Sequence, residues 1–215
     1  MRRSLVLAAS LSLVLPALAL AAPSEIPIDR VSLPAAKSQS VHLKFPVGEL
    51  RVEASTGSQV ELELTARCKG WNRNGCEADA RRVHIETDHS GGRLDFTVDG
   101  YPKFHSNDFN LRGVLRVPAR MDVDLDMGVG DLKVADIEGD LHVELGVGDA
   151  DIRASSAAVR SVDAQAGVGD AVVIAGGSRA RRHGFVGATA SWDEGRGRSS
   201  VRLHVGVGDA TVRVD

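Results

Sequence analysis

The sequence predicts an all-β protein, and three observations carry this prediction. The tetrapeptide Gly-Val-Gly-Asp occurs four times, at 128–131, 146–149, 167–170 and 206–209. Apolar and polar residues alternate on both sides of each copy, which is the pattern of strands with one buried face. Helices need apolar residues at three- and four-residue spacing, and the flanks of the tetrapeptide lack that spacing.

The copies recur at a regular interval. Gly130, Gly148 and Gly169 mark three successive copies, and the interval between them is roughly 20 residues. Gly208 follows after about two such intervals, and a degenerate copy at 186–188 divides the gap. An earlier copy, Val47-Gly48-Glu49, stands about four intervals before Gly130. This is the behaviour of a repeat architecture.

One repeat is long enough for two short strands and two bends, but it cannot bury its apolar face alone. Stacking equivalent units about 4.8 Å apart would bury a continuous core. The sequence therefore predicts a β-solenoid, a β-helix-like fold of 18–21-residue coils, with the tetrapeptides at the corners and their valines pointing inward. An antiparallel β-sandwich is the alternative. The glycines expected to allow the corners are Gly128, Gly130, Gly146, Gly148, Gly167, Gly169, Gly206 and Gly208.

The chain begins with the features of a secretory signal peptide. Met1-Arg2-Arg3 is basic, an apolar stretch follows, and Ala19-Leu20-Ala21 offers small residues for cleavage. We expect residues 1–21 to be removed, which leaves 24 basic and 29 acidic side chains and a net charge of 24 − 29 = −5. The absence of a basic cluster argues against a nucleic-acid partner. We expect a periplasmic, secreted or surface protein without a transmembrane segment in its mature chain.

We expect residues 22–215 to form a single domain. Regular repeats fill 121–215, and more irregular coils fill 38–120. The segment 66–82 contains both cysteines, Cys68 and Cys76. An exported chain meets an oxidising compartment, so we expect these two to form a disulfide. A metal site would need more ligands than this segment supplies.

The segment LRGVLRVPARMDVDLDMGVGDLKVADIEGDLHVELGVGDADI resembles the bacterial "putative adhesin" β-strand-repeat family. The shared features are a strand that ends in Val-Pro-Ala and alternating strands punctuated by Gly-Asp. The resemblance covers about residues 38–215. It implies an exported, β-helix-like protein with no established reaction and no catalytic residues to carry over.

Two sets of acidic residues are candidate cation sites. The tetrapeptide aspartates Asp131, Asp149, Asp170 and Asp209 should share one corner, where stacked carboxylates would favour a weakly bound Ca²⁺. Alternatively, each carboxylate accepts backbone N–H groups of its own turn. The run Asp122, Asp124 and Asp126 offers a second cation face, or a solvated strand. The histidines at 42, 84, 89, 105, 142, 183 and 204 show no ligand spacing, and we expect no metal ligands among them.

The sequence shows no nucleophile elbow and no Cys-His arrangement, so we expect a non-enzymatic protein without a cofactor. It should act like an adhesin and present an extended surface to an envelope polymer, another protein or a second copy of itself. A periplasmic polysaccharide-binding or polysaccharide-processing protein is the alternative. The aromatic residues that could form a partner surface, or plug the solenoid ends, are Trp71, Tyr101, Phe104 and Trp192.

Overall fold

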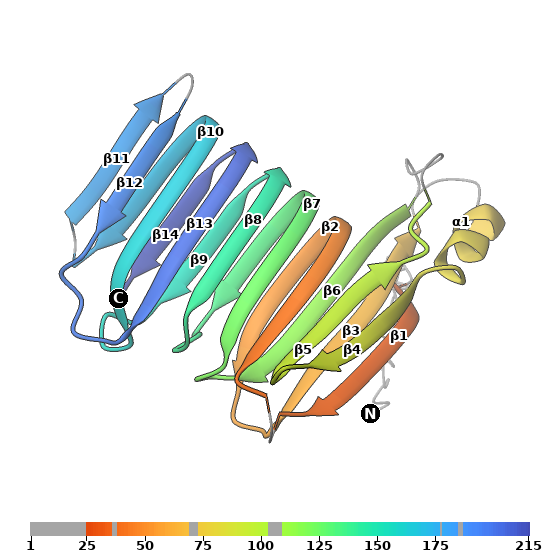
Figure 1. Cartoon of the computed structure of the whole chain (residues 1–215). Helices are drawn as coiled ribbons and strands as arrows, with labels where there is room; N and C mark the ends of the chain where they lie inside the picture. The colour runs from red at the N-terminus through yellow and green to blue at the C-terminus, as the bar shows by residue number, and fades with distance from the viewer. Residues whose placement is uncertain (1–24, 36–37, 69–72, 103–108, 177, 185–186) are drawn as a thin grey trace, which may run out of the picture.

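The structure, a computed structural model, describes residues 25–35, 38–68, 73–102, 109–176, 178–184 and 187–215. The expected signal peptide lies outside these residues. The described residues form one 14-stranded sheet and a short helix, which confirms the all-β prediction (Figure 1). In chain order the elements are β1 (Glu25–Pro34), β2 (Ser40–Ser55), β3 (Gln59–Cys68), α1 (Arg73–Ala80), β4 (His84–Ser90), β5 (Arg93–Asp99), β6 (Phe109–Pro118), β7 (Asp122–Ala135), β8 (Leu141–Val147), β9 (Ala150–Ala154), β10 (Val159–Ala175), β11 (Ser178–Gly184), β12 (Ala188–Trp192), β13 (Ser199–Val207) and β14 (Ala210–Val214).

The sheet folds into two layers because its long strands bend at the glycine corners (Figure 1). The first halves of β2, β7 and β10 lie in the first layer, together with β8 and β13. Their second halves lie in the second layer, together with β9 and β14. All of these repeat strands pair in parallel, and the apolar side chains between the layers form the core.

The order of the strands in space differs from their order in the chain. The path through the first layer is β2, β7, β8, β13 and β10, so β13 enters between β8 and β10. In the second layer β14 likewise lies between β9 and β10. The early copy at 47–49 sits directly against the first tetrapeptide, with Gly48 opposite Gly130. The long stretch of chain between these two copies therefore does not correspond to four stacked coils.

The residues between these two copies form the end of the sheet instead. β3 pairs antiparallel with β1 on one side and with β6 on the other. β4 and β5 form an antiparallel hairpin whose second strand joins the first half of β2. This differs from the irregular coils expected over 38–120. The Cys68–Cys76 disulfide ties the end of β3 to α1, so that prediction is confirmed.

The opposite end of the sheet is also antiparallel. β11 pairs with the second half of β10, and β12 pairs with its first half. The degenerate copy at 186–188 therefore does not add a parallel coil, because β12 begins there and runs against its neighbour; Val186 itself lies outside the described residues.

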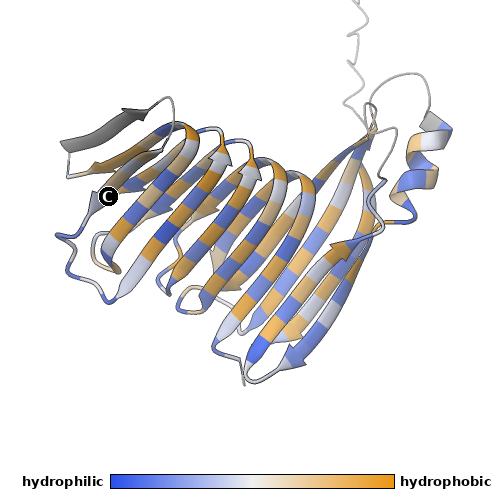
Figure 2. Ribbon diagram, turned by 45° about the horizontal axis from the view of Figure 1, so that its top comes forward, coloured by the Kyte–Doolittle hydropathy of each residue, from blue (hydrophilic) through white to orange (hydrophobic). Residues whose placement is uncertain are grey.

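The alternation of apolar and polar residues explains which side chains are buried. Orange and blue residues alternate along the strands in Figure 2, and the apolar set faces the space between the layers. Where the early repeat places the large Phe45, the opposing strand β6 has Gly113. A Cβ added at Gly113 would lie 2.8 Å from the Phe45 ring, so the small residue makes room for the large one.

Candidate functional site

Each tetrapeptide corner connects the two layers, and the corners of neighbouring strands stack directly on one another along the sheet. A Cβ added at Gly146 would lie 2.6 Å from the carbonyl oxygen of Gly128 in the neighbouring corner, and one at Gly167 would lie 2.6 Å from that of Gly206. The second glycine of each copy has a positive φ, which is +133° at Gly148. Both glycines are therefore needed, the first for close approach and the second for its backbone conformation.

The valines of the corners point outward, contrary to the expectation that they face the core. Met127 and Leu132 fill the inner side of the first corner, which leaves the valine at its apex no room inside. Strand pairing places four of these side chains in one row, which we call the valine ridge, and each is 44–47 % exposed. In spatial order its members are Val129, Val147, Val207 and Val168.

The corner aspartates hold neighbouring corners together. The Asp149 carboxylate accepts a hydrogen bond from the backbone N–H of Asp209 at 3.0 Å. The Asp209 carboxylate in turn accepts one from the backbone N–H of Asp170, also at 3.0 Å. Each bond joins two corners, rather than closing the turn to which the aspartate belongs. The binding of Ca²⁺ by Asp131, Asp149, Asp170 and Asp209 stays a prediction.

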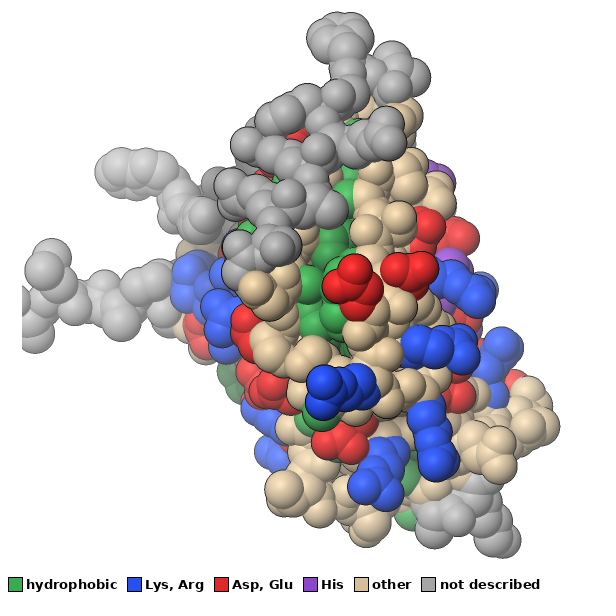
Figure 3. All heavy atoms as spheres, turned by 90° about the vertical axis from the view of Figure 1, so that its left-hand side faces the viewer, with side chains coloured by type: hydrophobic (Ala, Val, Ile, Leu, Met, Phe, Trp, Pro, Cys, Tyr) green, Lys and Arg blue, Asp and Glu red, His purple; other side chains and the backbone are tan. Residues whose placement is uncertain are grey.

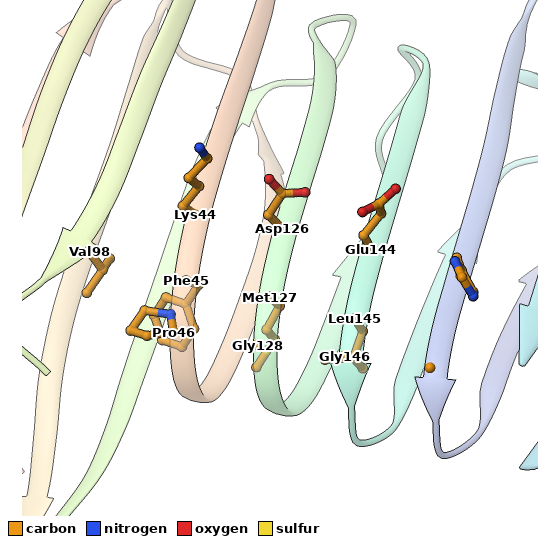
Figure 4. Close-up of a pocket in the computed structure, with 12 residues that line it drawn as sticks. Lys44, Phe45, Pro46, Val98, Asp126, Met127, Gly128, Glu144, Leu145 and Gly146 are labelled. Carbon is orange, nitrogen blue, oxygen red and sulfur yellow. The ribbon is translucent and has the colours of Figure 1, made fainter. Parts of the chain in front are cut away.

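A shallow groove of about 510 Å³ runs across the first layer beside the ridge. Lys44, Asp126 and Glu144 extend side by side from β2, β7 and β8 along this groove (Figure 4). Register continues the row through His204 of β13, because His204 lies opposite Glu144. The groove thus combines an apolar floor with a line of titratable side chains.

His42 lies at one end of this charged surface and is 9 % exposed. Its Nδ1 is 3.1 Å from an oxygen of Asp95, and its Nε2 is 3.1 Å from an oxygen of Asp126. Burial disfavours the charge on Asp95, but hydrogen bonds from His42 and Arg93 outweigh that effect and lower the pKa of this carboxyl. His42, Asp124 and Asp126 each offer a ligand atom, and these three atoms lie within 4.8 Å of one another.

A second groove, of about 700 Å³, lies on the second layer over β6, β2, β7, β9 and β14. Ion pairs link the charged side chains at its β6 end. Arg112 donates to Glu49 at 2.8 Å and to Glu25 at 2.7 Å, and Arg67 donates to Glu25 at 2.8 Å. The Arg67 hydrogen bond, assisted by Arg112, holds the pKa of Glu25 below its usual value. The charged side chains at this end of the groove are therefore already paired with one another.

Comparison with known proteins places the chain in a family. Residues 22–182, more than half of the chain, match the sequence profile described as the N-terminal domain of toast_rack, DUF2154. The chain belongs to this family. No curated protein matches it. The match to this profile also confirms the expected resemblance to a β-strand-repeat family without an established function.

One similar structure is a putative cell adhesion protein from Clostridium sporogenes ATCC 15579, with 16 % identity and a TM-score of 0.54 over 90 % of this chain and 100 % of that chain. Another is a putative adhesin from Bacteroides fragilis NCTC 9343, with 11 % identity and a TM-score of 0.29 over 90 % and 98 % of the two chains. The first likeness supports a shared fold. Within the described part of this toast_rack family member, no helix has the length and apolar character to cross a bilayer.

Of the aromatic residues predicted to form a partner surface, the structure describes Tyr101 and Trp192, which lie at opposite ends of the sheet. Tyr101 precedes β6 and packs edge-on against Phe109 with ring centroids 5.6 Å apart, and burial raises the pKa of its hydroxyl. Trp192 ends β12 at the opposite end of the sheet and packs partly against the core. Trp71 and Phe104 lie outside the described residues. The two described aromatics therefore support the sheet ends.

Among the residues that the structure describes, charged side chains surround a narrow apolar strip at the end of the molecule where β10 and β12 lie. Figure 3 views the molecule from this end and shows Lys and Arg side chains gathered over the lower half of the face.

Sequence reasoning missed His42 as a partner of the acidic run. Spacing along the chain hides the partnership, because His42 and Asp124 are far apart in the sequence. The repeat alignment contains the signal, since His42 and Asp124 occupy the same phase of two copies that prove to be neighbours in the fold.

Proposed function

We propose that this protein is exported and acts, without catalysis, as an adhesin-like scaffold that presents the valine ridge and its adjoining groove to an envelope or extracellular partner. The observation that carries the proposal is the ridge itself. Four large aliphatic side chains stand nearly half exposed in one row, although each could have been polar without disturbing the glycine corner.

We further propose that the repeat region is a β-solenoid. Two features support this architecture over an antiparallel sandwich. The neighbouring repeat strands run parallel, and equivalent corner residues face one another, as Gly48 faces Gly130. A scaffold of this kind places identical side chains about 4.8 Å apart, which suits a long or repetitive partner.

The similar structure described as a putative cell adhesion protein favours a binding role over an enzymatic one. The signal-peptide pattern at residues 1–21 supports export. A polysaccharide-binding or polysaccharide-processing protein is the competing function, and the mixed-charge groove on the second layer is the place where a sugar polymer would bind.

The test compares binding of the purified protein to intact bacterial cells, isolated cell walls and outer-membrane vesicles. In the first variant Val147→Thr and Val207→Thr replace two ridge methyl groups by hydroxyls and keep the β-branched shape. The matched control, Val147→Ile with Val207→Ile, keeps the ridge apolar. We expect the threonine variant to lose binding and the isoleucine variant to retain it, with unchanged circular dichroism in both.

Equal binding of the wild type and the threonine variant to every surface would contradict the proposal that the valine ridge contacts the partner. A hydrolysis screen on purified polysaccharides covers the competing function, and turnover of any polymer would overturn the non-catalytic assignment. Sedimentation velocity of the same variants tests whether the partner is a second copy of the chain.

A further inference from the structure

The His42 cluster has a contact pattern that hydrogen bonding with a neutral side chain does not satisfy. Carboxylate oxygens face both ring nitrogens at 3.1 Å, Asp95 at Nδ1 and Asp126 at Nε2. A neutral imidazole carries a single N–H, so one of the two contacts would set a nitrogen lone pair against a carboxylate. A doubly protonated ring, or a cation between His42 and one of the carboxylates, removes this conflict.

The surroundings of the two His42 ring nitrogens differ, and this difference indicates on which side a cation would bind. Arg93 also holds the Asp95 carboxylate, because its Nε is 3.0 Å from the oxygen that faces His42 and 3.2 Å from the other oxygen. With Asp95 as the acceptor of an Nδ1 proton, the Nε2 lone pair would be directed toward β7. A carboxylate behind one nitrogen of a histidine is the usual arrangement when the other nitrogen binds a metal ion.

On the β7 side two further ligands converge. Asp124 and Asp126 are two residues apart on one strand, so both project from the same face of the sheet. Asp124 lies directly opposite His42 in the strand register. The 3.1 Å between Nε2 and Asp126 is close to the separation of about 3.3 Å between two ligands of a tetrahedral zinc ion.

We propose that His42, Asp124 and Asp126 bind a divalent transition-metal cation, with Zn²⁺ as the probe, through Nε2 and two carboxylate oxygens. Asp95 is the positioning residue for His42. The Asp126 side chain is 43 % exposed, so the ion can enter from solvent and water can complete its coordination. An imidazole ligand selects a zinc-like ion over Ca²⁺ or Mg²⁺, which prefer oxygen ligands.

A second cluster in the described chain, His84, Glu86 and Asp99, differs in its exposure to solvent. All three residues are exposed. The His84 Nδ1 is 2.9 Å from a backbone carbonyl oxygen, and its Nε2 is 3.4 Å from Glu86. The two clusters can be separated by testing one histidine from each.

The experiment titrates the purified protein with ZnCl₂ by calorimetry and with Co²⁺ by visible absorption, which reports the ligand geometry. We expect one equivalent to bind. Asp126→Asn and His42→Gln should each weaken Zn²⁺ binding at least about tenfold, and Asp95→Asn should weaken it about 10–100-fold through the misplaced histidine. His204→Gln, which changes another histidine of the same layer, is the matched control and should bind as the wild type does.

Because Asp126 is partly exposed, Asp126→Asn keeps the test valid if the more buried His42→Gln fails to fold. Absence of Zn²⁺ binding in the folded wild type would overturn the proposal. So would a loss of binding in His84→Gln with unchanged binding in Asp126→Asn, since that places the ion at the other cluster. A parallel titration with CaCl₂ addresses the corner aspartates separately, and a Ca²⁺ preference at the His42 cluster would also contradict the assignment.

Discussion

The corner at Gly148 gives the most direct test of the stacking. Its φ of +133° costs a residue with a side chain about 1–3 kcal/mol. A Cβ there would also collide with the carbonyl oxygen of Gly130 in the next corner. Relieving that collision moves the backbone and weakens the 2.8 Å hydrogen bond from the Gly148 N–H to the Val207 carbonyl, a further loss of about 1 kcal/mol. We expect Gly148→Ala to lower the free energy of unfolding by about 2–4 kcal/mol.

For a chain of this size that loss lowers the melting temperature by about 4–16 °C, measured by far-UV circular dichroism. Two controls isolate the cause. At Gly57 the nearest atom to an added Cβ is 3.8 Å away, so Gly57→Ala should change stability by less than about 1 kcal/mol. Val147 is 45 % exposed, and Val147→Ala should likewise cost less than about 1 kcal/mol. If the Gly148→Ala and Gly57→Ala variants have the same melting temperature, the corners are not packed as described.

Three further outcomes are expected. Cys68→Ala with Cys76→Ala opens a loop of eight-residue separation, so unfolding should cost about 2–3 kcal/mol less; a melting temperature equal to that of the wild type would contradict this. The folded-state pKa of Asp95 lies below its usual 3.8, so its contribution to stability is present above that value and is lost as the pH falls below it; urea titrations between about pH 5 and about pH 3 should show a smaller loss of stability in Asp95→Asn than in the wild type. A chain ending at Arg198 lacks β13 and β14 and should expose β10–β12 to limited proteolysis, and an unchanged digestion pattern would refute the observed strand order.

Much of the fold follows from short-range patterns. The alternation around each Gly-Val-Gly-Asp predicted strands whose apolar faces are indeed buried, as Leu125, Val143 and Leu203 show. The order of the strands in space could not be predicted in this way. Spacing along the chain shows where each repeat begins, but it does not show which other repeat lies beside it. The sequences around the copies at 206–209 and 167–170 do not differ in a way that predicts their neighbours. The sequence therefore does not predict that the later copy lies between the copy at 146–149 and the copy at 167–170.

The candidate site was predicted in part for the same reason. The outward acidic face of β7 followed from alternation, since Asp124 and Asp126 flank the buried Leu125. His42 could join them only once the early repeat was known to pair with β7. The outward valines were missed because alternation continued through the corner would place Val129 inside, whereas the inner side of the bend is already filled.

β13 and β14 lie between strands that precede them in the chain, and this order affects how the chain folds. When β10 has been synthesised, its eventual partners on that side do not yet exist, and it cannot dock permanently on β8 and β9. The middle of the sheet must stay open until residues 199–214 arrive to close it. Such late closure adds contacts between segments far apart in the chain, which slows the final step of folding.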